Sequence, residues 1–217
     1  METLQSHFFK QIEKENMLKI FSALDKIEHD ELLYSRFIAY LLNPNAHHGM
    51  GNEFLKLFVQ SVLQIDNFDC ENCTVKTEYD DIDLFIYNNE QAIIIENKIY
   101  TADENSSQKS DGYKGELERY YNRIKKGVND YNIGIVKREE VFMVYLTLDG
   151  RLPSAISMGK TLRKNDIICI DYTKRIRKWL LDCILIVEEK DYLLIQSISQ
   201  HQELITNLTN DFNQTKR

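Results

Sequence analysis

The sequence predicts an α/β domain in which a mixed β-sheet has helices on both faces. Runs rich in Ile, Phe and Tyr, bounded by polar turn residues, predict strands at 74–79, 82–87 and 92–99. Further strand-like runs at 141–147 and 167–170 alternate with helical patterns. Such an alternation after a hairpin is typical of a sheet that is covered by helices on both faces.

Helical patterns occupy the first third of the chain. Apolar spacing predicts helices over 2–26, over 31–42 with Asp30 as its N-cap, and over 52–64. Asn43-Pro44 ends the second of these, which is apolar nearly all round and should be largely buried.

Three more helices are expected later in the chain, over 114–126, 174–187 and 191–210. Thr173 should cap the second, and the third either packs on the domain or forms a homodimer. The polar segment 101–112 is predicted to be a mobile loop.

The 217 residues are expected to form a single domain, with N-terminal helices over 1–65, a core over 74–188 and a C-terminal helix over 190–210. A hydrophobic content of 43% is enough for a sizeable core. No apolar run reaches the roughly 20 residues of a membrane span, and no signal peptide is evident. We therefore expect a cytoplasmic protein with no membrane partner, whose cysteines are free thiols.

Two pairs of potential metal ligands are interpreted as incidental. Cys70 and Cys73 form a lone C-x-x-C, and no second pair with zinc spacing follows. His47 and His48 are adjacent, and neighbours in sequence seldom both bind one ion. They are expected in a solvated turn, with a loop near the substrate entrance as the alternative.

The hairpin over 82–99 is predicted to bring two acids together. An even loop of two or four residues pairs positions whose numbers sum to 179, so Asp83 lies opposite Glu96. Their Cβ atoms would be about 4.5–5.5 Å apart, with Lys98 next along the same face. Facing carboxylates repel each other, so a divalent cation held by both is expected.

This pattern resembles the PD-(D/E)XK nuclease superfamily, whose signature is an Asp on one strand and Glu/Asp-x-Lys on the next. Asp83 and Glu96-Asn97-Lys98 match it, and the resemblance runs from about Leu18 to Leu181. Further segments follow the order of one uncharacterised nuclease-like branch. They are SRFIAYLL before Asn43-Pro44, HHGMGNEFLKLF after it, IIIENKIYTAD, ELERYY and VYLTLDG.

The resemblance implies a restriction-endonuclease-like fold and a metal-dependent nuclease. Asp83 and Glu96 would hold one or two Mg²⁺ or Mn²⁺ ions, with the Asn97 carbonyl as a further ligand. Glu31 would be a third acid of the site, or else a surface acid stabilised by a helix N-terminus. Lys98 would orient the attacking water and stabilise charge that develops on the phosphate.

Substrate contacts are expected from Ser35, Glu116 and Tyr120. The branch usually has Gln-Leu-x-Arg-Tyr where this chain has Glu116-Leu117-Glu118-Arg119-Tyr120. A carboxylate thus replaces an amide, which could alter metal affinity or weaken substrate binding. Asp80 and Asp81 stand where relatives have a small or basic residue, and they could compete for the cation or only raise the local negative potential.

Charge is unevenly distributed along a chain with a net charge of -7. The segment 66–83 has seven acids and one base, whereas 160–178 has seven bases and two acids. Arg175 and Arg177, in the basic segment, are predicted to bind substrate phosphates. The alternative is that this segment is only a solvated face.

The sequence therefore predicts a Mg²⁺-dependent phosphodiesterase that acts on DNA, with RNA less favoured. The main alternative is a catalytically inactive nuclease-fold module that binds nucleic acid or a protein partner. Glu116 and the acidic net charge favour this alternative, whereas the complete Asp83, Glu96 and Lys98 set favours the enzyme. A third interpretation makes Lys98 and Glu96 a structural ion pair.

Overall fold

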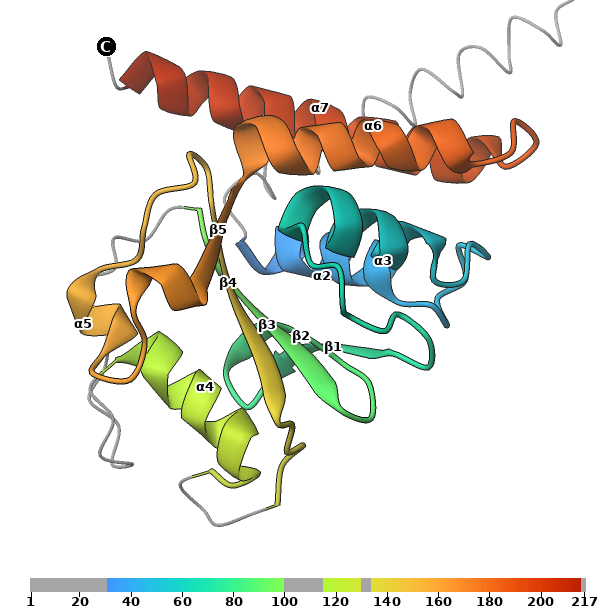
Figure 1. Ribbon diagram of the computed structural model, residues 1–217. Helices are drawn as coiled ribbons and strands as arrows, with labels where there is room; N and C mark the ends of the chain where they lie inside the picture. Colours follow the sequence, from blue (N-terminus) through green and yellow to red (C-terminus); the bar gives the residue numbers. More distant parts are fainter. Residues whose placement is uncertain (1–30, 100–114, 130–133, 216–217) are drawn as a thin grey trace, which may run out of the picture. The chain divides into compact units, whose positions relative to one another are not determined.

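The computed structural model describes residues 31–99, 115–129 and 134–215. In this part of the chain five strands form one sheet, with the spatial order β1-β2-β3-β4-β5 (Figure 1). β2 is antiparallel to both of its neighbours, β1 and β3, whereas β3, β4 and β5 are parallel to one another. The strands are β1 (Thr74–Tyr79), β2 (Ile82–Tyr87), β3 (Gln91–Lys98), β4 (Glu140–Thr147) and β5 (Ile167–Asp171).

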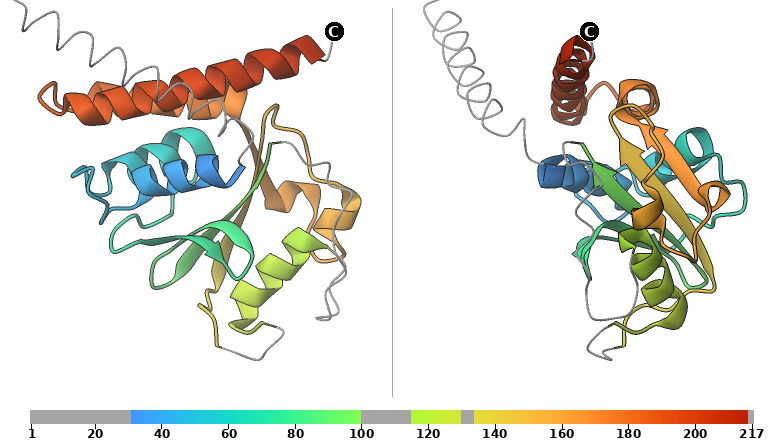
Figure 2. Two further views of the ribbon diagram at one scale, coloured as in Figure 1. Left: turned by 180° about the vertical axis from the view of Figure 1, so that it is seen from behind. Right: turned by 90° about the vertical axis from the view of Figure 1, so that its left-hand side faces the viewer.

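Helices cover both faces of this mixed sheet, as the sequence predicts (Figures 1 and 2). On one face lie α4 (Glu116–Lys126) and, packed against it, α5 (Ala155–Met158). On the other lie α2 (Glu31–Leu42) and α3 (Glu53–Leu57). Outside α3, the helices α6 (Arg177–Ile186) and α7 (Tyr192–Thr215) lie side by side. Three helical turns differ from α-helix: η1 (Phe58–Leu63) and η3 (Tyr172–Ile176) are π-helical, and η2 (Lys164–Asp166) is a 3-10 turn.

Several predicted boundaries agree with the structure, and α2 and β1 agree at both ends. The helix predicted over 52–64 becomes α3 followed by η1, and the one over 174–187 becomes η3 followed by α6. The last helix extends to Thr215 and packs against α6 and η3, burying Ile198 and Ile205. The predictions for 2–26, Asp30 and 101–112 lie outside the described residues.

The predicted cap of the helix after β5 is wrong. Asp171, not Thr173, is the N-cap, because its Oδ1 accepts a hydrogen bond from the backbone N–H of Lys174 at 2.6 Å. The Thr173 hydroxyl donates to the same Oδ1 at 2.6 Å. A carboxylate has acceptor capacity for both donors, so the acid at the strand end begins the helix.

The core is built around β3, which is buried on both faces from Ala92 to Ile95. Ala92 and Ile94 face α4 and pack in one cluster with Leu117, Tyr120 and Ile124. Burial of each large apolar side chain contributes about 1.5–3 kcal/mol, so this strand is a rigid support for the polar residues at its end. Among the helices described, none is long and apolar enough to cross a membrane.

Candidate active site

The β2–β3 hairpin brings Asp83 and Glu96 close together. Leu84 pairs with Ile95, and every described pair of these strands has numbers that sum to 179, as predicted. If that register is continued by one step beyond the paired residues, it would place Asp83 opposite Glu96 on the face that α4 covers. Asp83 Oδ2 accepts a hydrogen bond from the backbone N–H of Asn97 at 2.8 Å, just beyond the last paired residues.

Glu96 is buried with an incomplete set of partners. Glu96 is 1% exposed, and its Oε1 forms an ion pair with Lys98 Nζ. Within the described residues, Oε2 has no hydrogen-bond partner. Burial, and next the charge of Asp83, raise the pKa of Glu96 well above its ordinary value. A buried, unpaired carboxylate oxygen beside a second carboxylate fits a divalent cation.

Lys98 is held between two acids. Besides its pair with Glu96, its Nζ lies 3.7 Å from Glu116 Oε2, and Tyr120 donates to Glu116 Oε1 at 3.3 Å. Burial lowers the pKa of Lys98, but the nearby carboxylates outweigh burial and the net effect raises it. Lys98 is therefore a fixed cation, and Glu116 at the start of α4 helps to fix it.

The side chain of Asn97 points to the opposite face of the sheet and makes a complete network. Its Nδ2 donates to Ser35 Oγ at 3.0 Å and to the backbone carbonyl of Glu31 at 3.2 Å. Its Oδ1 accepts from the Tyr172 hydroxyl at 3.2 Å. Ser35 is 3% exposed, so its position favours support of β3 over direct contact with substrate. The sequence analysis missed Tyr172, although an Asn inside a run of isoleucines signals buried partners.

The predicted metal-binding acids, Asp83, Glu96 and Glu31, differ in how they would contribute to a metal site. Burial raises the pKa of Asp83, the amide of Asn97 lowers it, and the charge of Glu31 raises it, with a net increase. Glu31 is thus close enough to act on Asp83 electrostatically. Among the described residues, no three His, Cys, Asp or Glu side chains form a ready metal-binding group. A cation here would depend on the facing acids, Asp83 and Glu96, together with backbone oxygen and water.

A model of the PD-(D/E)XK nuclease superfamily matches residues 18–203 of the chain. The chain belongs to the PD-(D/E)XK nuclease superfamily. The comparisons with curated proteins and with solved structures gave no match. Membership agrees with the five-stranded mixed sheet and its helices, and the matched range includes the hairpin that carries Asp83 and Glu96-Asn97-Lys98.

The basic segment of this nuclease-family chain does not form one patch. Lys160 and Lys164 precede β5, whereas Lys174 follows it, so the strand separates them. The end of β5 lies level with Lys98, because Lys98 pairs with Thr147 and Thr147 with Asp171 across three parallel strands. Only the part of the segment after β5 is therefore at the edge of the sheet that carries the site.

The two arginines predicted to bind phosphate have different positions. Arg175 donates from Nη1 to the backbone carbonyl of Val62 at 2.9 Å and thereby joins η3 to η1. Arg177 is partly buried at the start of α6. Both follow β5, but the bond of Arg175 gives that residue a structural task that the sequence analysis did not foresee.

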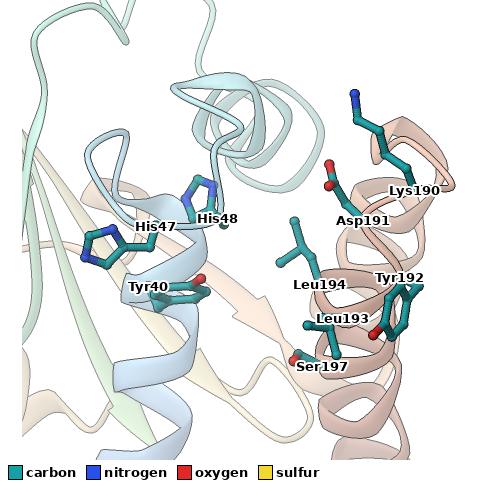
Figure 3. A pocket seen from close by; sticks show the side chains of 9 residues that line it. All are labelled: Tyr40, His47, His48, Lys190, Asp191, Tyr192, Leu193, Leu194 and Ser197. Carbon is teal, nitrogen blue, oxygen red and sulfur yellow. The ribbon is translucent and has the colours of Figure 1, made fainter.

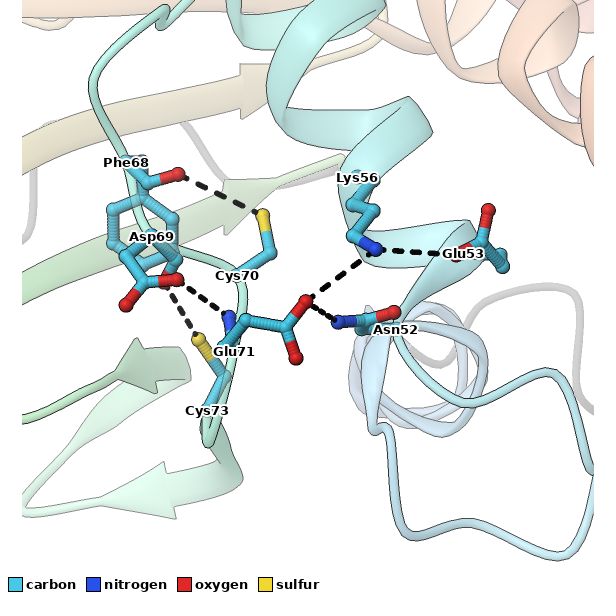
Figure 4. A network of polar contacts seen from close by, with 8 residues as sticks. All are labelled: Asn52, Glu53, Lys56, Phe68, Asp69, Cys70, Glu71 and Cys73. Atoms are coloured by element: carbon cyan, nitrogen blue, oxygen red, sulfur yellow. Dashed lines mark hydrogen bonds and ion pairs between the residues drawn. The ribbon is translucent and has the colours of Figure 1, made fainter.

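The C-x-x-C motif is structural in this chain (Figure 4). Cys70 and Cys73 are buried free thiols that donate to the carbonyls of Phe68 at 3.9 Å and Asp69 at 3.3 Å. Burial raises the pKa of Cys70 to about 11 and that of Cys73 to about 12. Neither thiol is a reactive thiolate at neutral pH, in agreement with the interpretation of an incidental pair.

The histidine turn is partly buried, which corrects the expectation of a solvated turn. His48 is 7% exposed, its Nδ1 accepts from the Met50 amide at 3.0 Å, and its Nε2 lies 3.0 Å from the Asn43 carbonyl. Burial lowers the pKa of His48, so the ring is neutral and serves as a brace after α2. His47 is exposed.

A hollow of about 320 Å³ lies beside this turn, between the end of α2 and the start of α7 (Figure 3). Tyr40, His47 and His48 line one side, and residues 190–194 with Ser197 line the other. None of the signature residues lines it. The hollow is therefore separate from the candidate active site.

Proposed function

We propose that this protein is a Mg²⁺- or Mn²⁺-dependent nuclease that hydrolyses phosphodiester bonds in DNA. The observation that carries the proposal is the buried Oε2 of Glu96, which has no hydrogen-bond partner in the described chain and belongs to an acid on which the charge of Asp83 acts. An apolar residue would fill this position at lower cost, so the unpaired oxygen indicates a ligand. Superfamily membership makes a nucleic acid the expected substrate.

The residues of the site have distinct tasks in this proposal. Asp83 and Glu96 hold the ion, with the Asn97 carbonyl as a further oxygen ligand and Glu31 as an outer acid. A bound Mg²⁺ supplies a polarised phosphate and a water of lowered pKa. Lys98 stays protonated between its two acids, so it donates hydrogen bonds to the attacking water and to the phosphate oxygens.

The structural ion-pair interpretation explains less of the site. Lys98 does pair with Glu96, but the pair uses Oε1 and leaves Oε2 without a partner in the described residues. A pair that served stability alone would be expected to satisfy both oxygens, since an unsatisfied buried acceptor costs about 1–3 kcal/mol. The metal site accounts for both oxygens.

A non-catalytic nucleic-acid-binding module is the second candidate, and Glu116 is the observation that favours it. Its carboxylate lies 3.7 Å from Lys98 and competes with phosphate for the ammonium group. In this candidate the acids would still bind metal, but Lys98 would not reach the substrate. A cytoplasmic location and a homodimer stay predictions from the sequence.

The test combines metal titration with cleavage assays. Wild-type protein is titrated with Mn²⁺ by calorimetry and then assayed with Mg²⁺ on circular, linear and single-stranded DNA and on RNA. The proposal expects metal binding, cleavage of DNA, and loss of both in Asp83→Asn and Glu96→Gln. Metal binding without cleavage of any substrate would favour the second candidate. No metal binding, even with DNA present, would contradict the proposed function.

A further inference from the structure

The turn that precedes Asp83 has an unfavourable backbone. Tyr79 pairs with Ile82, so Asp80 and Asp81 form a two-residue hairpin loop. Both have positive φ, 52° and 70°. Loops of this kind normally use Asn-Gly or Asp-Gly, so Asp80 suits its position but Asp81 stands where Gly is preferred. Two adjacent aspartates also repel each other, so this loop depends on an external partner.

Arg123 of α4 is that partner. The residue is 5% exposed, and its Nη1 lies 3.1 Å from Asp80 Oδ2 and 3.6 Å from Asp81 Oδ2. The same Nη1 donates to the backbone carbonyl of Asp80 at 3.3 Å. Asn129 adds a bond from Nδ2 to Asp80 Oδ1 at 3.0 Å. The guanidinium thus neutralises two acids and binds the backbone of the loop.

The contacts of Arg123 also bear on the part played by the two loop acids. Their carboxylates are drawn to α4 by the guanidinium, so Arg123 is their counter-ion. The alternative that they compete with Asp83 for a cation is therefore disfavoured. Without Arg123, the loop would place two further negative charges within a few residues of Asp83.

One helix consequently contacts both strands of the hairpin that carries the acids. The first turn of α4 places Glu116 beside Lys98 at the end of β3. Two turns later, Arg123 holds the loop that leads into β2 and Asp83. Because Ile82, between loop and acid, is fully buried, displacement of the loop is transmitted to Asp83.

We propose that Arg123 is a positioning residue that sets the place of Asp83 relative to Glu96. This inference rests on the proposed metal site and assigns Arg123 no contact with substrate. The bond from the Asn97 amide to Asp83 Oδ2, 2.8 Å long, reports on the place of Asp83 even without metal. Partners that orient metal ligands typically change metal affinity or activity 10–100-fold when they are removed.

A matched control lies at the same end of the sheet. Arg36 of α2 forms an ion pair with Glu78 at 3.0 Å, two residues before Asp80, but both side chains are more than half exposed. Arg36→Gln removes the same chemical group as Arg123→Gln from a neighbouring position. The difference between the two variants isolates the buried contact to the loop.

The first measurement is hydrogen exchange of the Asn97 amide in metal-free protein, with amides of β5 as an internal reference. Arg123→Gln should exchange about tenfold faster at Asn97, the effect of losing roughly one hydrogen bond, while β5 amides and Arg36→Gln stay unchanged. Equal exchange at Asn97 in wild type and Arg123→Gln would overturn the proposal. Equal acceleration at Asn97 and in β5 would also overturn it, since the role would then be only structural.

The second measurement is a calorimetric Mn²⁺ titration of the folded variants. Arg123→Gln should weaken Mn²⁺ binding about tenfold or more, with Arg36→Gln at the wild-type affinity. Unchanged affinity in Arg123→Gln would contradict the proposal. If Arg123→Gln does not fold, Arg123→Lys keeps the charge but loses the planar fork, and it should fall between wild type and Gln. If wild type binds no Mn²⁺, the proposed function fails, and the exchange of Asn97 still decides the inference.

Discussion

The two faces of β3 differ in whether their buried polar side chains have hydrogen-bond partners. On the face toward α2, Asn97 is 3% exposed, and its amide is bonded to Ser35, Tyr172 and the Glu31 carbonyl. On the face toward α4, Glu96 is 1% exposed and keeps an oxygen without a partner in the described residues. A satisfied network supports a strand, whereas a buried acceptor without a partner has a cost that a bound ion would offset.

The two faces depend on each other. The Asn97 side chain ties β3 to α2 and η3, while its backbone amide donates to Asp83 Oδ2. One residue therefore links the supporting network to the candidate metal ligands. The supporting face holds β3, and the bond from the Asn97 amide holds Asp83 beside that strand. If the proposed function is correct, these bonds contribute to the preorganisation that catalytic sites require.

The largest expected effect is on the α4 face, in Lys98→Ala. This change should reduce cleavage at least about a hundredfold while Mn²⁺ affinity stays within a few-fold of wild type. The ammonium is a donor only and so cannot bind a cation. Cleavage assays and calorimetric titration on the same preparation give both values.

Glu96→Ala is the matched comparison for Lys98→Ala, because it removes the partner of the same ion pair. It should lose cleavage and metal binding together. If both variants instead lose only stability, and to the same extent, Lys98 and Glu96 are a structural pair and the catalytic assignment is wrong.

The second prediction concerns the supporting face. Asn97→Ala should lower the free energy of unfolding by about 2–3 kcal/mol, because it removes the acceptor of the buried Tyr172 hydroxyl and one of the two bonds of Ser35. Urea unfolding checks this. A backbone carbonyl remains at position 97, so a metal ligand is not removed. A change below about 0.5 kcal/mol would show that the network is not a support.

The sequence was sufficient to predict the register of β2 and β3 but not the hydrogen-bond network around Asn97. Alternation and the polar loop predicted which strand residues pair from Leu84 and Ile95 to Tyr87 and Ala92, so this register followed from local pattern alone. Tyr172 and Ser35 contact Asn97 from elements 75 and 62 positions away in the chain. Such contacts depend on how helices pack on the sheet, which no local period encodes.

Charged patches, like the hydrogen-bond networks, could not be predicted from local sequence alone. The acids of the segment 66–83 looked like one acidic pocket, but Asp80 and Asp81 pair with Arg123, and Asp69 accepts from the amide of Glu71. The basic segment looked continuous but is divided by β5. The charge runs in the sequence therefore overstated both patches, because acids of the first run have local partners and a strand divides the second run.

The third prediction uses the raised pKa of Glu96. A folded-state pKa above the ordinary value of about 4.5 means that the folded protein loses stability as pH rises above that value. Glu96→Gln removes this charge, and its amide can donate to Asp83. Without metal, the variant should exceed wild type by about 1 kcal/mol at pH 7, with the difference vanishing near pH 4.5.

Thermal unfolding between pH 4.5 and 8 tests this prediction, with and without Mg²⁺. Excess Mg²⁺ should stabilise wild type and leave Glu96→Gln unchanged, because the ion binds the folded state through the missing carboxylate. A Glu96→Gln variant that is less stable than wild type at every pH would show that the buried charge is well compensated, contrary to the contrast between the two faces.

The smallest expected effect concerns the two ends of β5. Lys174 is exposed and follows the strand at the edge that carries Lys98, whereas Lys164 is exposed and precedes the strand. Lys174→Gln should weaken DNA binding and lower the slope of log affinity against log salt by about one, the effect of one lost phosphate contact. Lys164→Gln should leave both unchanged.

Fluorescence anisotropy with a labelled duplex, at several salt concentrations and with Ca²⁺ in place of Mg²⁺, measures the two slopes. Equal slopes in both variants and wild type would mean that the basic segment is a solvated face at both ends. Equal losses of affinity in both variants would mean that DNA contacts both ends of β5. The sheet edge that carries Lys98 would then contribute no more to DNA binding than the opposite edge.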